Sequence, residues 1–188
     1  ISAFKLGAYF KPFSPEESKR FYAKACEICK HTAETTTDAT EKAQALEMLG
    51  YMEQEGLGVD ADPAAGIAHL EQAATYWAYE RLFQTYAKGI GVAVDLPKAL
   101  SYARNIADTA ADADNMANAS PNAGQMAWLL ADSYLNGKNG VTKDIATGEH
   151  YLNIADRLNI RNAIYCKGLR LKNEGKNAEA YICFNRAA

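Results

Sequence analysis

The sequence predicts an all-α protein built as a solenoid of stacked helix pairs. A unit of 33 residues recurs in the middle of the chain, where the segment that begins at Ala45 is repeated from Ala78. Within each copy, apolar residues recur at the three- and four-residue spacing of one helix face, and no alternating β-branched run indicates a strand. Because one helix pair cannot bury its apolar side alone, successive pairs are expected to stack.

Three copies are clear. The first contains residues 45–50 and the turn 56–59, the second follows from Ala78, and the third starts at Met126 with one extra residue between its two turn glycines. Both ends of the chain carry only degenerate copies. We therefore expect one solenoid domain over residues 1–188, with a degenerate N-terminal helix pair (1–42), repeats at 43–77, 78–122 and 123–160, and a degenerate C-terminal helix pair (161–188).

The helix boundaries follow from glycine and aspartate. In the best copy, the first helix is marked by Ala78, Leu82 and Tyr86, and the second by Ala99, Tyr102 and Ile106. The two glycines between these helices can adopt the positive φ that ends a helix. The dipeptide Asp62-Pro63 and the tripeptide Asp95-Leu96-Pro97 are typical starts for the second helices.

The first and second copies start 33 residues apart, whereas the second and third start 48 residues apart. The excess is a small, polar and acidic insertion at about 108–124, which we expect to form a helix end and a loop. Its aspartates Asp108, Asp112 and Asp114 lack the regular ligand ladder and final Glu of an EF-hand, so we interpret them as solvated. The formal glycosylation sequon at residues 118–120 is interpreted as coincidence.

These residues resemble a known family. The copy at 78–107 matches its pattern at Ala78, Leu82, Tyr86, Gly89, Gly91, Val92, Asp95, Lys98, Ala99, Tyr102 and Ala107. The pattern resembles the Sel-one-like repeat, a helix-turn-helix relative of the tetratricopeptide repeat, and it extends well over about 43–160. The resemblance implies a right-handed α/α solenoid. The chain departs from the pattern at Phe83, Glu53, Ala65-Gly66 and Thr147-Gly148.

The resemblance also implies a binding surface, because first helices line the concave face in the tetratricopeptide superfamily. The solvent-facing residues expected there are Gln44, Glu47, Tyr51, Gln54, Trp77, Glu80, Gln84, Lys88, Gln125, Trp128, Asp132, Asn136, Asn162 and Tyr165. Rigid aromatic side chains among amide and carboxylate groups are typical of peptide-binding surfaces. The alternative is that Trp77 and Trp128 pack between repeats.

Four cysteines raise the question of metal, haem or disulfide chemistry. The segment Cys26-Glu-Ile-Cys29-Lys30-His31 lacks the His directly after the second Cys that haem attachment requires, and a zinc site would need further ligands. We expect no cofactor and no metal. The helices expected to carry Cys166 and Cys183 form the last pair, where both a disulfide and two buried thiols are open alternatives.

Catalytic motifs are missing from the sequence. It contains no phosphate loop, no Gly-x-Ser-x-Gly elbow and no His-Glu-x-x-His helix, and His31, His69 and His150 have no evident nucleophile beside them. We therefore do not expect an enzyme. The alternative is an enzyme or small-molecule binder, because the resembled family includes bacterial members that bind or weakly hydrolyse β-lactams. Its nucleophile would be a serine with a base beside it; Ser101 and Ser133 lie within repeats, and neither has an obvious partner.

Composition and charge exclude some classes of binding partner. The chain has 20 Lys and Arg against 23 Asp and Glu, a net charge of -3, which argues against nucleic acid and anionic membranes as partners. No apolar run reaches the ~18 residues of a membrane span. Because the chain begins at Ile1, we expect a mature product or a fragment, with any targeting segment outside it. That leaves a periplasmic, secreted or cytoplasmic location open.

The repeat pattern, the family resemblance and the lack of catalytic motifs together predict a non-catalytic adaptor or scaffold. We expect it to bind a protein or an extended peptide on its concave face, and exposed apolar surface at the solenoid ends would allow self-association. The family resemblance implies a setting in bacterial envelope, secretion or virulence-related systems. The resemblance also leaves an immunity partner of a toxin as an alternative. A purely structural spacer is a third interpretation.

Overall fold

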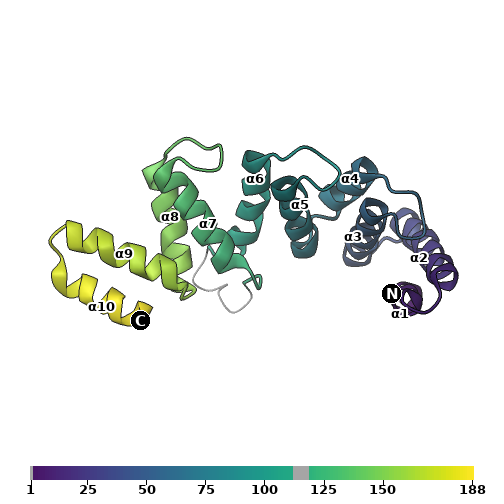
Figure 1. Cartoon of the computed structure of the whole chain (residues 1–188), viewed down its shortest axis with the longest axis horizontal. Coiled ribbons are helices and arrows are strands. Elements are labelled where there is room, and N and C mark those ends of the chain that lie inside the picture. The colour runs from purple at the N-terminus through teal and green to yellow at the C-terminus, as the bar shows by residue number, and fades with distance from the viewer. Residues whose placement is uncertain (1, 112–118) are drawn as a thin grey trace. The chain divides into compact units, whose positions relative to one another are not determined.

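The computed structural model describes residues 2–111 and 119–188. These residues form ten α-helices and one short 3-10 helix, and they contain no strand, which confirms the all-α fold class (Figure 1). The chain divides into two compact units, Ile1–Asp95 and Leu96–Ala188. Within the described residues, no helix is long and apolar enough to span a membrane.

The first unit contains five helices, α1 (Ser2–Phe10), α2 (Pro15–Thr35), α3 (Ala39–Glu55), α4 (Pro63–Ala73) and α5 (Tyr76–Lys88). Each helix packs against the next one along the chain, and α3 also contacts α5. The core between α1, α2 and α3 is built from small and sulfur-containing side chains with few large ones. Its buried members are Ala3, Tyr22, Ala25, Cys26, Cys29, Ala45, Leu49 and Met52.

The second unit contains α6 (Leu96–Ala107), the 3-10 turn η1 (Asp108–Ala110), α7 (Ala123–Asn136), α8 (Ile145–Arg157), α9 (Arg161–Asn173) and α10 (Asn177–Ala187). The pairs α7–α8 and α9–α10 form helix hairpins, and α6 packs on α7. Leu130, Ile154 and Ile106 are completely buried or nearly so. The helices are therefore held by the apolar positions that the repeat pattern marks.

The predicted helix ends are confirmed. Gly56, Gly89 and Gly137 follow α3, α5 and α7 in the left-handed conformation, and their N–H groups donate to carbonyls in the last turn. The Asp62 carboxylate accepts the N–H of Ala65 at 3.0 Å and so caps α4. Capping of this kind satisfies backbone groups that helix ends otherwise leave without partners.

The second glycine of each turn lies against another helix. A Cβ added at Gly91 would lie 2.5 Å from the ring of Pro63, at the start of α4. One added at Gly140 would lie 2.8 Å from the ring of Pro97, near the start of α6. Both glycines also have positive φ, so a side chain is disfavoured there for two reasons.

Two departures from the repeat pattern compensate each other. Glu53 stands where other copies carry Tyr, and His69 stands where they carry an aromatic residue in the second helix. In the structure, His69 Nδ1 lies 2.6 Å from Glu53 Oε2, and Glu53 is only 7% exposed. A buried carboxylate needs such a partner because desolvation of an isolated charge is costly.

A third departure, Gly66 in place of Ala, lies at a close helix crossing. A Cβ added at Gly66 would approach the carbonyl oxygen of Gly50 to 2.7 Å. Here α3 and α4 come closer than two side-chain-bearing positions would allow.

Part of the insertion lies outside the described residues. This part includes Asp112 and Asp114, considered above for calcium, and Asn118 of the glycosylation sequon. The described part of the insertion begins with η1, which follows α6 directly. For the repeat boundaries we propose the divisions expected from the sequence, with repeats at 43–77, 78–122 and 123–160 between the two degenerate end pairs.

Candidate functional site

A groove in the first unit collects residues from α3 and α5, and it is here called the α3–α5 groove. It encloses about 440 Å³. Its lining consists of Phe4 on α1, Glu47, Met48 and Tyr51 on α3, Leu70 on α4, and Trp77, Glu80, Arg81 and Gln84 on α5. Residues three and four apart share a helix face, which explains why Trp77, Glu80, Arg81 and Gln84 meet at one surface.

The start of α5 is fixed to α3 by Thr75. Its hydroxyl accepts the N–H of Ala78 at 3.1 Å and caps the helix. The same hydroxyl donates a hydrogen bond to Glu47 Oε2 across the groove. One threonine therefore both begins α5 and orients a groove carboxylate.

Arg81 lines the groove and is bonded to two residues at the end of α3. Its Nε donates to Gln54 Oε1 at 2.7 Å, and its Nη2 pairs with Glu55. Its guanidinium lies 5.1 Å from the centroid of the Tyr51 ring, within cation-π range. Gln54 completes the network by donating from Nε2 to Thr85 Oγ1 at 3.2 Å.

Aromatic side chains form the exposed part of the groove. Trp77 is 61% exposed and Tyr51 is 36% exposed. The Tyr51 ring is also braced by Phe4 in an edge-on contact with centroids 6.1 Å apart. The alternative in which Trp77 packs between repeats is wrong, because Trp77 is mostly exposed in the first turn of α5 and does not end the preceding helix, which stops at Ala73.

The structure brings together five of the residues expected on the concave face, Glu47, Tyr51, Trp77, Glu80 and Gln84. Gln44 and Lys88 are exposed on the same two helices but do not line the groove. The prediction that Gln54 faces solvent is wrong, because it is 7% exposed and bonded between Arg81 and Thr85.

Four groove residues were missed, namely Phe4, Met48, Leu70 and Arg81. Arg81 could have been found from its position four residues after Trp77, on the same helix face. Phe4 belongs to a degenerate copy that carries no usable signal.

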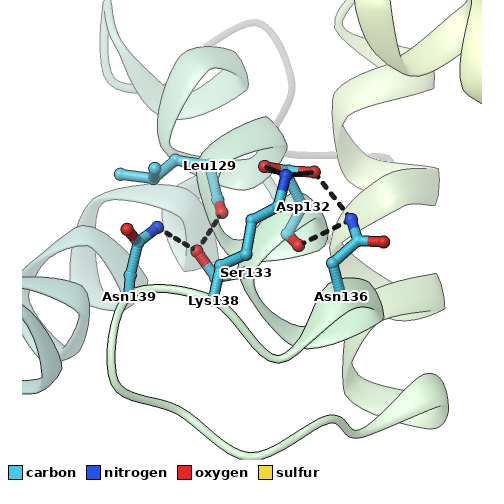
Figure 2. Close-up of polar contacts among 6 residues, drawn as sticks. All are labelled: Leu129, Asp132, Ser133, Asn136, Lys138 and Asn139. Carbon is cyan, nitrogen blue, oxygen red and sulfur yellow. Dashed lines mark hydrogen bonds and ion pairs between the residues drawn. The ribbon is translucent and has the colours of Figure 1, made fainter.

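The corresponding surface of the second unit is a polar cluster on α7 and the turn after it (Figure 2). Asn136 Nδ2 donates to Asp132 Oδ1 at 2.7 Å, and Lys138 Nζ lies 2.9 Å from Asp132 Oδ2. Asn139 Nδ2 donates to Ser133 Oγ at 2.8 Å, and Ser133 Oγ donates to Leu129 O at 2.7 Å. We call these residues, Asp132, Ser133, Asn136, Lys138 and Asn139, the α7 polar cluster.

The remaining predicted residues lie on α7 and α9. Gln125 and Asn162 are exposed, Trp128 is half-buried, and Tyr165 is 52% exposed with its ring centroid 5.5 Å from that of Phe184. None of these four residues lines the α3–α5 groove.

The cysteines are all free thiols. Cys166 and Cys183 lie on α9 and α10 as expected, and no bridge joins them in the structure. Cys183 is buried and Cys166 half-buried. The disulfide between them stays a prediction. In the described part of the chain no three or more His, Cys, Asp or Glu side chains gather as a metal site would require.

The two candidate nucleophiles have structural partners. Ser101 Oγ donates to the carbonyl of Lys98 at 2.7 Å, one turn earlier in α6. Ser133 is completely buried, and its hydroxyl accepts from Asn139 Nδ2 and donates to the carbonyl of Leu129. Neither arrangement places a general base beside the hydroxyl, which nucleophilic catalysis requires.

The helix pairs, the paired turn glycines and the capped second helices define an α/α repeat protein. The sequence profile of the Sel1 repeat matches residues 43–75, 78–108 and 125–155, which together are just over half of the chain. The chain therefore belongs to the Sel1 repeat family. Sel1 repeats form protein-interaction modules, and proteins built from them are generally non-catalytic scaffolds.

Two solved structures are similar to this chain. A protective antigen of uropathogenic Escherichia coli that displays an SLR fold is 18% identical, with a TM-score of 0.49, over 98% of this chain and 44% of its own. This chain thus spans less than half of that protein. A Sel1 repeat protein from Oxalobacter formigenes is 17% identical, with a TM-score of 0.47, over 99% of this chain and 80% of its own. A search of curated proteins gives no match.

Proposed function

We propose that the chain is an adaptor or scaffold module that binds another protein or an extended peptide in the α3–α5 groove, without catalysing a reaction. The observation that carries this proposal is that two exposed aromatic residues, Trp77 and Tyr51, line one groove together with hydrogen-bonding side chains. Aromatic anchors of this kind dominate the binding energy of many protein interfaces.

The groove is organised before any partner arrives, which supports the proposal. Tyr51 is held between Phe4 and Arg81, and Arg81 is itself bonded to Gln54 and Glu55. Glu47 is oriented by Thr75. Because these side chains are already ordered, binding would lose little conformational entropy.

The test is affinity capture with the full chain, followed by calorimetry with the purified partner. We expect Trp77→Ala combined with Tyr51→Ala to weaken binding at least tenfold. Tyr9→Ala is the matched control, because Tyr9 is 64% exposed, similar to Trp77, but lies outside the groove. Equal affinity of the groove variant and the wild-type chain would contradict the proposal.

The second set of predicted contacts is tested separately by Trp128→Ala combined with Tyr165→Ala. Loss of affinity in both double variants would extend the binding surface to α7 and α9, as the family resemblance implies. The proposed setting, a bacterial envelope, secretion or virulence-related system, rests on that resemblance, and the identity of the captured partner tests it.

A further inference from the structure

Helix α9 forms a hairpin with α10 and also packs on α8 (Figure 1). On the side of α9 that meets α8, cations are paired with carboxylates. Lys167 Nζ lies 2.6 Å from Asp156 Oδ2, and Arg170 pairs with Glu149. Arg186 on α10 pairs with Asp156 as well. The charges of these three cations are therefore used inside the second unit.

The outer side of α9 carries a row of exposed residues, here called the α9 stripe. The row consists of Arg161, Tyr165, Leu169 and Lys172. These residues follow one another at intervals of four, four and three positions, and such intervals place side chains next to one another on one helix face. Tyr165 is 52% exposed and Leu169 is 41% exposed. An aromatic and an aliphatic side chain therefore lie between two cations.

The two cations of the α9 stripe are not paired within the part of the chain that the structure describes. Arg161 and Lys172 form neither an ion pair nor a side-chain hydrogen bond with a residue of that part. The sequence of α9 contains no Asp or Glu. The hairpin has two carboxylates, namely Glu174, which lies 2.8 Å from Lys176 Nζ, and Glu179 in the first turn of α10. Only Glu179 therefore stands against the two cations of the stripe.

The charge around the α9 stripe stays positive when the neighbouring helices are included. Residues 145–188, which contain α8, α9 and α10, have seven Lys and Arg against four Asp and Glu. On α7, Asp132 is already paired with Lys138. Since the whole chain has a net charge of -3, this part of it differs in sign from the rest. A partner with carboxylates is therefore attracted to these helices.

The apolar part of the α9 stripe is held in place by α10. The ring of Tyr165 lies against that of Phe184, with centroids 5.5 Å apart. A Cβ added at Gly168 would lie 2.8 Å from the same Phe184 ring, so the two helices are in close contact at this point. Because Tyr165 already has a packing partner, it would lose little conformational entropy on binding.

We infer that the α9 stripe is a second docking surface, which binds a partner segment whose acidic residues flank an apolar residue. The apolar side chain packs on Tyr165 and Leu169, and the carboxylates reach Arg161 and Lys172. The two cations are about 16 Å apart along the helix, a distance that an extended segment covers in about five residues. This surface shares no residue with the α3–α5 groove, so the inference goes beyond the proposed function.

Two other occupants are disfavoured by charge. A second copy that docked its own α9 stripe here would bring like charges together. An anionic membrane requires a clustered positive field, whereas the stripe has two cations in a chain of net charge -3. A partner segment with a few carboxylates matches the stripe better than either.

The test is selection of random twelve-residue peptides, displayed on phage, against the immobilised full chain. Counter-selection against the Tyr165→Ala chain removes peptides that bind elsewhere, including those that bind the α3–α5 groove. We expect the remaining peptides to carry Asp or Glu on both sides of an apolar residue. Synthetic copies should bind about tenfold more weakly to the chain with Arg161→Gln and Lys172→Gln, and more weakly at high salt.

The matched control is Lys19→Gln combined with Lys24→Gln, which removes the same charge from exposed positions on α2. This control should leave the affinity unchanged. An equal loss of affinity in the control would assign the effect to the net charge of the chain and overturn the inference.

Four further outcomes would also overturn it. In the first, no peptide survives the counter-selection, and in the second the surviving peptides lack acidic residues. In the third, sedimentation shows self-association that Tyr165→Ala abolishes, which would assign the stripe to a second copy. In the fourth, the chain binds phosphatidylglycerol vesicles through Arg161 and Lys172 and no acidic peptide is recovered. The proposed function is tested by Trp77 and Tyr51 and would stand in all four cases.

Discussion

The α3–α5 groove and the α7 polar cluster lie on the first helices of different repeat copies, yet their outward side chains make different contacts. Tyr51 in the first clear copy aligns with Asp132 in the third. In the first unit, the Tyr51 ring contacts Phe4 and Arg81, and the residue is 36% exposed. In the second unit, Asp132 is bonded to Asn136 and Lys138 on its own surface.

This difference shows that the repeat specifies a scaffold and leaves the outward positions open. Ala78 and Leu82 in the second copy, and Leu130, the equivalent of Leu82 in the third copy, are completely buried, so the packing determines what can stand there. Outward side chains do not enter that packing and can vary with function. We therefore expect the first unit to bind and the α7 polar cluster to contribute mainly to local order.

The largest loss of unfolding free energy should come from substituting a turn glycine that packs against another helix. Gly58 has a φ of 76°, and a Cβ added there would lie 2.2 Å from the backbone nitrogen of Ala23 on α2. Gly175 in the second unit has a φ of 79° but no neighbour within 4 Å. Gly58→Ala should cost about 3 kcal/mol or more, and Gly175→Ala about 1 kcal/mol, in urea unfolding. Equal losses would contradict the close packing assigned to the first unit.

A smaller loss of unfolding free energy is expected from breaking the pair of Glu53 on α3 and His69 on α4. His69→Leu removes the partner of Glu53 and should destabilise the protein by about 2 kcal/mol, because the buried carboxylate is left without its bond. Glu53→Leu combined with His69→Leu should recover most of that loss. Urea unfolding at pH 7 measures both. A double variant as unstable as the single one would show that the pair itself is not the cause.

The alkylation rates of Cys26 in the first unit and Cys166 in the second unit should differ by about tenfold. Burial, with a further contribution from Cys29, raises the pKa of Cys26 to about 11. Cys166 is half-buried, and burial also raises its pKa, while Arg170 lowers it. Because thiolates react and thiols do not, native Cys166 should be alkylated faster than Cys26 at pH 8. Peptide mass spectrometry after iodoacetamide treatment measures both rates.

The same raised pKa gives a pH dependence of stability. The unfolded chain releases the Cys26 proton near the ordinary thiol value of 9.0, below the value of about 11 in the folded chain. The contribution of the protonated thiol to stability is therefore complete below pH 9 and is lost as the pH rises toward 11. Cys26→Ala should flatten this decline, and an unchanged decline would assign it to other groups.

The smallest effect is expected at the surface of the α7 polar cluster. Lys138→Ala removes an ion pair with Asp132 whose members are both substantially exposed. Exposed pairs are screened by water, so the change in unfolding free energy should be about 0.5 kcal/mol or less. A loss above about 1.5 kcal/mol would mean that this cluster supports the second unit more than its exposure suggests.

The sequence was sufficient to predict the helices and their ends, because these depend on local rules. Ala78, Leu82 and Tyr86 mark a helix face by spacing alone, and Gly89 ends that helix by its own backbone preference. Family resemblance then indicated which helices carry the outward-facing residues. Five of those residues do meet in one groove.

The parts of the groove that escaped prediction depend on contacts between distant segments. Phe4 reaches Tyr51 from the first helix, and no repeat pattern specifies that contact. The polar side chain of Gln54 is typical of a surface residue. It is buried because its amide forms hydrogen bonds with Arg81 and Thr85 on a later helix. Glu53 and His69 each looked like an isolated departure until the fold placed them together.

The turn glycines have a consequence for aligning such chains. Gly89 and Gly91 are separated by one residue and Gly137 and Gly140 by two, yet in both turns the second glycine lies against the proline near the start of another helix, while Gly58 in the first copy lies against Ala23 on α2. What the three turns share is therefore close contact with a neighbouring helix, and not a fixed count of residues. Copies aligned by fixed spacing would slip by one position here, whereas copies aligned on the second turn glycine stay in register.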